Sequence, residues 1–223
     1  MKHKTFFSVA LATLAIAAIS IAFVTHTTSA MTPTNGYKPP ITGTNLDKYT
    51  SHPKRHLVIV TKQGTIKCQM FEKVAPNHVA NFMDLAKTHF YDSTYFHRCI
   101  PGFMIQGGDP NTKDNDYTND GSGNGPRRIN AEFNEIHHAR GILSTARTQD
   151  PNSASCQFFI MHGDAGFLDR QYTVWGQVIE GMDVVDKIMA LPDVTNRPKA
   201  QIDQQGPNPG KAAEILKMYV EGE

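Results

Sequence analysis

The sequence predicts a mainly β protein, an antiparallel barrel or sandwich with two helices as plugs or lids. Two observations support this fold class. About eight short apolar runs of strand length are separated by turn residues. Only two well-separated segments carry apolar residues at helical spacing. A parallel α/β fold would alternate helices with strands throughout, and this order of segments argues against it.

Residues 1–30 have the pattern of an export signal. Lys2 and Lys4 precede an almost wholly apolar run from Thr5 to Val24, and Thr28-Ser29-Ala30 supplies a small-residue cleavage site. We therefore expect a signal peptide over 1–30 and a periplasmic or secreted protein. Because the apolar run approaches spanning length, an uncleaved membrane anchor that leaves the domain facing the periplasm is the alternative.

Residues 31–53 are expected to be a linker, because proline and glycine recur there without periodic apolar content. An extended tether is a better interpretation than a proline-rich partner-binding segment. The remaining residues, 54–223, are enough for one domain with its own core.

The composition is ordinary for a globular protein, with 39% hydrophobic and 19% charged residues. The whole chain has a formal charge of +1, and Lys2 and Lys4 are the only charges in residues 1–30, so the rest carries −1. This balance does not favour nucleic acid or an anionic membrane surface as a partner.

The pattern of strands begins after the linker. Residues 57–60 and 66–71 flank a Lys62-Gln63-Gly64 turn and predict a hairpin, and Pro76 opens a helix that should end near His89. The later elements are expected as strands over 141–148 and 156–161, an irregular turn over 164–169, a strand over 172–178, a helix over 182–191, a loop over 197–210 and a last strand over 213–220, which also fits a helix.

The three cysteines, Cys68, Cys99 and Cys156, each lie in an apolar strand-like run. We expect them to be small buried side chains rather than ligands or nucleophiles. A disulfide between two of them is left open, because a sequence gives no distances.

Several common enzyme motifs are absent from the sequence, among them Gly-x-Ser-x-Gly, His-Glu-x-x-His and Cys-x-x-Cys. The glycines of residues 121–125 lack the lysine of a phosphate-binding loop, so a flexible wall beside a groove explains them better. Glu135 lies near His137 and His138, but adjacent side chains rarely share a metal, and a solvated turn is the preferred interpretation. We expect no metal, no cofactor and no covalent nucleophile.

Residues 94–109 are the most informative stretch, and they read as a strand, a Pro-Gly corner, a second strand and a glycine stop. Side chains alternate along a strand, so Phe96, Arg98 and Ile100 share one face. A guanidinium among such neighbours needs partners. An arginine at the rim of an apolar groove, steadied by the amide of Gln106, indicates a recognition or catalytic device.

Four segments carry a family resemblance: 95–109 (YFHRCIPGFMIQGGD), 141–147 (GILSTAR), 155–160 (SCQFFI) and 167–169 (FLD). In this order they resemble the cyclophilin family of peptidyl-prolyl cis-trans isomerases, over roughly residues 57–220. The resemblance implies a closed eight-stranded antiparallel β-barrel capped by an α-helix at each end. It also implies a shallow groove that binds an X-Pro dipeptide and accelerates rotation about its amide bond.

The resemblance also implies the site. Arg98 matches the catalytic arginine, and Gln106 matches the glutamine that holds it. Taken singly, each aromatic fits a barrel core equally well, but together with Arg98 and Gln106 the set favours a site. The matches to the apolar proline pocket are Phe103, Met104, Phe159 and Leu168, and the matches to the groove lining are Ala146 and Gln157.

Three further positions of the substrate-binding rim depart from many family members. Phe167 stands where many eukaryotic members have tryptophan, Tyr172 where they have histidine, and Arg147 where they have asparagine. These departures resemble the exported bacterial branch of the family. They leave isomerase activity intact as an expectation, and they imply weak binding of cyclosporin.

The expected function is therefore a metal-independent peptidyl-prolyl isomerase, a monomer whose partners are proline-containing polypeptides, that assists the folding of exported proteins. A membrane would be a partner only through an uncleaved N-terminal segment. The alternative is a non-catalytic proline-peptide binding or surface-adhesion module on the same barrel. Arg98 argues against that alternative, because binding alone does not require an arginine there.

Overall fold

The computed structural model describes residues 36–114 and 116–222. The signal peptide expected over 1–30 lies outside the described residues. Within those two ranges, no helix has both the length and the apolar character needed to cross a bilayer.

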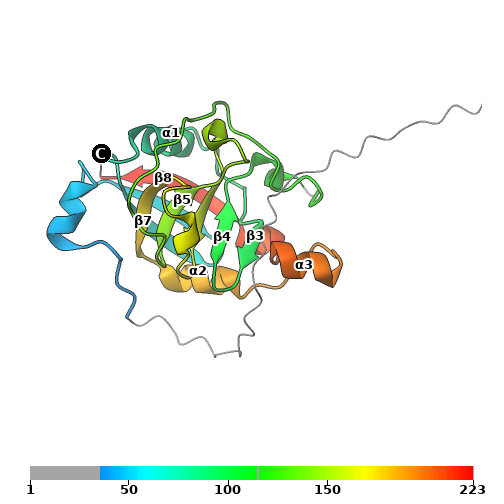
Figure 1. The fold of residues 1–223 in the computed structure, drawn as a ribbon. Helices are drawn as coiled ribbons and strands as arrows, with labels where there is room; N and C mark the ends of the chain where they lie inside the picture. The colour runs from blue at the N-terminus through cyan, green and yellow to red at the C-terminus, as the bar shows by residue number, and fades with distance from the viewer. Residues whose placement is uncertain (1–35, 115, 223) are drawn as a thin grey trace, which may run out of the picture. The chain divides into compact units, whose positions relative to one another are not determined.

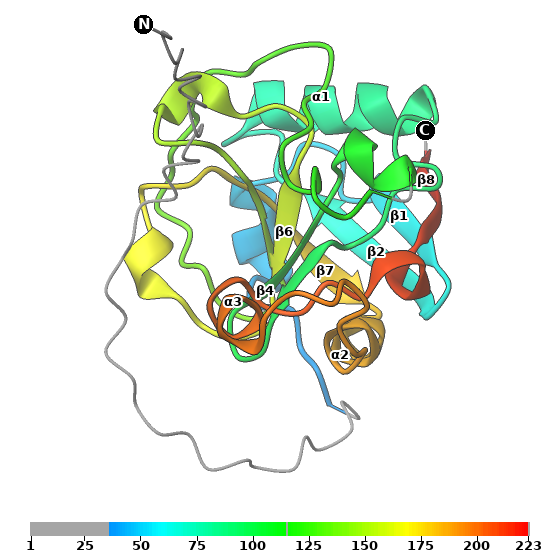
Figure 2. The same ribbon diagram turned by 90° about the vertical axis from the view of Figure 1, so that its right-hand side faces the viewer.

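Eight strands form one sheet in which all neighbouring pairs are antiparallel, in the order β3-β4-β6-β5-β7-β2-β1-β8 (Figures 1 and 2). In chain order the elements are β1 (His56–Thr61), β2 (Gly64–Met70), α1 (Pro76–Lys87), β3 (Arg98–Ile100), β4 (Met104–Gly107), β5 (Ile142–Thr145), β6 (Phe158–Met161), β7 (Val174–Glu180), α2 (Met182–Met189), α3 (Lys199–Gln205) and β8 (Ile215–Glu221). The helices α1 and α2 lie on opposite sides of the curled sheet (Figure 1). The predicted mainly β fold, an antiparallel barrel with two flanking helices, is confirmed.

The barrel is less completely closed than expected. The edge strands β3 and β8 do not pair with each other; instead, Ile215 N donates to Thr94 O at 2.7 Å and Phe96 N to Ala213 O at 3.2 Å. The outer edge of β3 is occupied by another segment, because Cys99 N donates to Pro207 O at 2.9 Å. "Closed" is therefore a slight overstatement, and the segment before β8 covers the edge that would otherwise be open.

The main core is formed by the sheet together with the buried faces of α1 and α2. Phe82 of α1 stacks on Trp175 of β7 with ring centroids 4.2 Å apart, and Phe158 meets both rings edge-on. The three cysteines are free and fully buried, as the apolar pattern predicts. Burial raises the pKa of the Cys99 and Cys156 thiols to about 12, so neither is a thiolate at neutral pH.

A second core lies under the predicted groove. Its buried members come from β4, β5, β6 and β7, from the turn before β7 and from loop residues near β2 and β5. The large side chains among them are Phe71, Met104, Ile136, Ile142, Phe159, Met161, Leu168 and Val174. Because several predicted pocket residues belong to this cluster, the pocket floor is rigid core rather than loop.

The described part of the expected linker, residues 36–53, is packed against the barrel. The backbone of Ile41 makes two hydrogen bonds with the buried side-chain amide of Gln177: Ile41 N donates to Oε1 at 3.0 Å, and Nε2 donates to Ile41 O at 2.6 Å. Tyr37 Oη donates to Val178 O at 2.9 Å, and the ring of Tyr49 lies 5.6 Å from that of Phe71. These anchors are isolated residues between prolines and glycines, so they produce no periodic pattern that a sequence reading can detect.

The loop expected over 197–210 contains the helix α3. This helix has no buried residues and only one large apolar side chain, Ile202, so it shows no apolar stripe. It lies outside the barrel beside β3 (Figure 1).

The packed N-terminal segment should matter for stability. A chain that begins at Lys54 loses the cover that Ile41 and Tyr49 give the second core, and it leaves the amide of Gln177 without its partners. We expect the free energy of unfolding to fall by about 3 kcal/mol or more relative to a chain that begins at Gly36. Urea unfolding of the two chains measures this, and equal midpoints would contradict it.

Candidate active site

The pairing of β3 with β4 places Arg98 directly opposite Gln106. Arg98 Nη1 donates to Gln106 Oε1 at 3.3 Å, and Gln106 Nε2 donates to Gln157 Oε1 at 2.9 Å. Gln157 Nε2 in turn donates to the backbone carbonyls of Gly121 and Gly123, at 3.0 and 2.8 Å. A chain of amides therefore connects the guanidinium to the glycine-containing loop.

A second acceptor holds Arg98 from the other side. Its Nε donates to the backbone carbonyl of Gln205 at 3.0 Å. Burial lowers the pKa of Arg98, but a guanidinium stays charged at neutral pH. Within residues 36–114 and 116–222, Arg98 Nη2 donates no hydrogen bond, so its two N–H groups remain available to a ligand. Gln205 lies 107 residues further along the chain, and no pattern in the sequence indicates its contact with Arg98.

The predicted pocket residues lie beside this arginine. Phe159 of β6 pairs directly with Gln106 of β4, and Phe159, Met104 and Leu168 are each at most 5% exposed. Phe103 lies at the edge of the pocket, with its ring 5.6 Å from that of Phe167. The strand register thus sets apolar surface next to the amides that hold Arg98.

The rim is formed by residues that the sequence singled out as departures. The guanidinium of Arg147 lies 4.5 Å from the centre of the Tyr172 ring and donates to Gln171 O through Nε and Nη2, at 3.1 and 2.9 Å. Tyr172 meets Phe159 edge-on at 5.9 Å. Phe167 is 51% exposed and offers no hydrogen-bond donor on its side chain. Ala146 N donates to Gln157 O at 3.0 Å, which fixes the groove lining.

The expectation of a solvated turn at His137 and His138 is wrong for His138. Its side chain is fully buried and stacks on Phe159, with ring centroids 6.2 Å apart. Its Nδ1 lies 2.9 Å from Asp169 Oδ1, and Asp169 also meets Nδ1 of His137 at 2.7 Å. The carboxylate provides the partner that a buried imidazole needs, and a single sequence does not reveal that contact.

This histidine pair fixes the ionisation of Asp169 behind the pocket. Burial alone would raise the pKa of Asp169, but the hydrogen bonds from His137 and His138 outweigh it and bring the pKa to about 2. Burial lowers the pKa of His138, so its ring stays neutral at pH 7. Asp169 directly follows Leu168, and these bonds therefore anchor one wall of the pocket.

The fold and this site define a class of protein: a β-barrel with one tethered arginine beside an apolar pocket. The family described as "Cyclophilin type peptidyl-prolyl cis-trans isomerase/CLD" matches residues 56–205. The chain belongs to this cyclophilin-type family, and it is a peptidyl-prolyl cis-trans isomerase.

Curated relatives and solved structures agree with this assignment. The chain is 41% identical over 141 residues to a probable peptidyl-prolyl cis-trans isomerase of Brucella suis, covering 61% of this chain and 72% of the relative. It is 42% identical over 142 residues to a peptidyl-prolyl cis-trans isomerase of Acinetobacter baylyi, covering 60% and 72%. A Cryptosporidium parvum cyclophilin crystallised in the presence of the dipeptide Ala-Pro superposes with a TM-score of 0.63 at 27% identity, covering 75% of this chain and 99% of that one.

The contacts of Asp169 predict a specific acid dependence of stability. The folded pKa is below the ordinary value of 3.8, so the ionised carboxylate stabilises the fold fully above about pH 4, and this contribution disappears as the pH falls toward 2. Asp169→Asn should therefore be less stable than the parent at pH 6, and the gap should narrow below pH 4. Urea midpoints across this range measure the gap, with Asp203→Asn on the exposed face of α3 as control. A gap that does not change with pH would refute the assignment.

Proposed function

We propose that Arg98 is the catalytic residue of this isomerase and that Gln106 holds it in place. Rotation about an X-Pro bond must overcome a barrier of about 18–20 kcal/mol, because resonance gives the C–N bond double-bond character. A donor aimed at the prolyl nitrogen withdraws its lone pair from that resonance in the twisted state. The observation that supports this role is the fork of Arg98, which is held at Nε and Nη1 while Nη2 keeps its donors.

The fixed geometry makes this an electrostatic mechanism. The two acceptors orient the guanidinium before a substrate arrives, so little reorganisation is needed when the bond twists. Each 1.36 kcal/mol of preferential stabilisation raises the rate tenfold. No group needs to exchange a proton, since an arginine stays charged throughout.

The remaining predicted residues have two proposed roles: some bind the proline and the substrate backbone, and the others contact the residues that flank the proline. Met104, Phe159 and Leu168 would hold the proline ring, because they offer buried apolar surface beside Gln106. Ala146 and Gln157 would bind the substrate backbone. The partly or largely exposed residues of the rim would contact the groups that flank proline, and these are Phe103, Arg147, Phe167 and Tyr172.

The protein would act on exported polypeptides. The pattern of residues 1–30 supports export, and uncatalysed X-Pro isomerisation takes tens to hundreds of seconds, slow enough to limit folding. The enzyme would work as a monomer in the periplasm or outside the cell, or on a retained anchor facing the periplasm. N-terminal sequencing of the exported protein distinguishes cleavage after Ala30 from retention.

Removal of the guanidinium should stop catalysis without abolishing binding. Arg98→Ala is expected to lower the catalysed exchange rate of a proline peptide by about a hundredfold, the usual loss for one preorganised donor. The peptide dissociation constant should change by only a small factor, since the apolar pocket is intact. Exchange spectroscopy and titration by NMR measure both quantities, and Arg127→Ala, which contacts α1, is the matched control. Full exchange in a folded Arg98→Ala protein would overturn the assignment.

The rim should give weak inhibition by cyclosporin. Phe167 has no donor at the position where a tryptophan would present its indole N–H. We expect Phe167→Trp to bind cyclosporin more tightly than the parent, while peptide isomerisation changes little. Inhibition curves for the two proteins test this, and tight inhibition of the parent would contradict it.

A further inference from the structure

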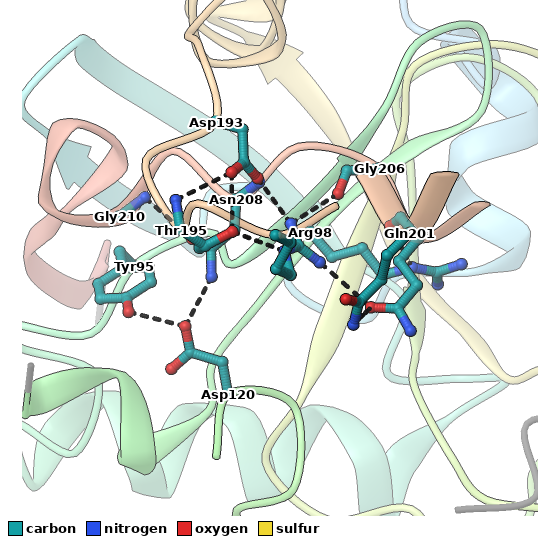
Figure 3. A network of polar contacts seen from close by, with 11 residues as sticks. Tyr95, Arg98, Asp120, Asp193, Thr195, Gln201, Gly206, Asn208 and Gly210 are labelled. Carbon is teal, nitrogen blue, oxygen red and sulfur yellow. Dashed lines mark hydrogen bonds and ion pairs between the residues drawn. The ribbon is translucent and has the colours of Figure 1, made fainter. Parts of the chain in front are cut away.

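The segment between α2 and β8 contains a second arginine with an unusual set of partners. Arg197, two residues before α3, donates to Thr195 Oγ1 at 2.6 Å and to Asp193 Oδ2 at 2.6 Å. It also reaches the far end of that helix, donating to Gln205 Oε1 at 3.1 Å and to the carbonyl of Gly206 at 3.0 Å. Figure 3 shows this network next to Arg98. One guanidinium therefore spans both ends of α3.

The far end of α3 is the end that holds the catalytic arginine. The peptide carbonyl of Gln205 accepts the hydrogen bond from Arg98 Nε, while the side chain of Gln205 and the carbonyl of Gly206 are held by Arg197. Both arginines thus bind Gln205, and Arg197 also holds the next residue, Gly206. A displacement of Gln205 and Gly206 would move the acceptor away from Arg98.

Gly206 fits closely against β3, the strand that carries Arg98. Its φ is +82°, and a Cβ at this position would lie 2.5 Å from the carbonyl oxygen of Cys99. Pro207 O accepts from Cys99 N at 2.9 Å. The segment therefore approaches the strand edge as closely as a backbone can, and few other positions of the acceptor are compatible with that contact.

Asp193, the acidic partner of Arg197, is itself held in place by several hydrogen bonds. Asp193 also accepts from the backbone N–H of Asn208 and of Thr195, at 2.8 and 2.9 Å. Burial alone would raise the pKa of Asp193, but these hydrogen bonds and that from Arg197 bring it to about 2. The side chains of Asp193 and Arg197 are only 11% and 19% exposed, which makes this ion pair less screened than a surface pair.

The hydrogen-bonded cluster around Asp193 is also connected to the loop that contains Gly121. Asn208 Nδ2 donates to Asp120 Oδ2 at 2.6 Å, and Tyr95 Oη donates to the same oxygen at 2.8 Å (Figure 3). Asp120 precedes Gly121, whose carbonyl accepts from Gln157 on the other side of Arg98. The polar network therefore surrounds the catalytic guanidinium on both sides.

We propose that Arg197 is a positioning residue of the isomerase, which orients Arg98 through the carbonyl of Gln205; this rests on the proposed catalytic role of Arg98. Fixing Nε in addition to Nη1 defines the plane of the guanidinium and directs Nη2 toward the substrate. Without Arg197, the end of α3 loosens and the fork of Arg98 rotates among several orientations. Binding of the proline ring does not depend on that orientation, so the loss falls on the rate of the bound peptide.

The test compares variants of the full-length chain. Arg197→Ala should lower the catalysed cis-trans exchange rate of a saturating Ala-Pro-containing peptide about tenfold. The peptide dissociation constant should stay within about twofold of the parent value, because a small misplacement of the catalytic group lowers the rate rather than the affinity. The control, Lys199→Ala, removes an exposed ion pair on the same helix, where Lys199 is 86% exposed, and should leave exchange unchanged.

A spectroscopic readout separates positioning from general destabilisation. The ¹⁵N-edited signal of the Arg98 Nε–H group, assigned by its absence in Arg98→Ala, should be protected from exchange with water in the parent and in Lys199→Ala. It should lose that protection in Arg197→Ala. If Arg197→Ala does not fold, Gln205→Ala carries the test, since it keeps the peptide carbonyl but removes one contact of Arg197; a smaller loss of about threefold is then expected.

The outcomes distinguish this inference from the function on which it rests. Full activity in Arg98→Ala would refute the catalytic role itself. The positioning role alone would be overturned by a different result. In that case Arg98→Ala is slow, but a folded Arg197→Ala variant keeps both its isomerisation rate and its protected Nε–H signal. Equal losses in Arg197→Ala and Lys199→Ala would also overturn it, because a general effect of α3 would then explain both.

Discussion

A guanidinium on an apolar strand must be satisfied by fixed acceptors, and this constraint organises the structure around Arg98. The pairing of β3 with β4 supplies the first acceptor by placing Gln106 directly opposite. A slip of one residue would turn Gln106 to the other face of the sheet and leave the charge without that partner. The second acceptor, Gln205 O, comes from a different part of the chain, and the same segment covers the open edge of β3 through Pro207 O. One segment, residues 205–207, therefore both covers the edge of the barrel and orients the arginine.

The barrel makes the proposed catalytic arrangement rigid and leaves sequence variation to the loops of the rim. Met104 and Phe159 lie on paired strands, and they share a core cluster with Phe71 and Val174. Phe167 and Arg147 lie outside the strands and are held by ring contacts and backbone carbonyls. Loops carry such differences at little cost to the fold, so substrate preference can change while the strands that hold Arg98 do not. Membership of a family that shares the fold agrees with this division.

The sequence was informative wherever local periodicity coincided with burial. The hairpin before α1, the stripe of α1 and the strand that carries Arg98 all follow from contacts within a few residues, and the structure has these elements. The expectation that Phe96 shares a face with Arg98 and Ile100 is wrong, because β3 begins only at Arg98 and Phe96 lies in the main core with Cys99. The bonds from Ile41 to Gln177 and from Asp169 to His138 connect distant residues without any period, so a single sequence does not show them. The helix α3 was missed for the related reason that it buries no side chain. Gln205 contributes through its backbone carbonyl, and a backbone atom leaves no trace in residue identity.

In the proposed mechanism Arg98 is held at Nε and Nη1 and presents Nη2 to the prolyl nitrogen. A crystal structure of the protein with an X-Pro peptide in the groove tests it most directly. We expect the proline ring to lie against Met104, Phe159 and Leu168. We also expect an Arg98 nitrogen within hydrogen-bond reach of the prolyl amide and an unbroken hydrogen bond from Nε to Gln205 O. A peptide bound in that pocket with the guanidinium turned away from the prolyl amide would contradict it.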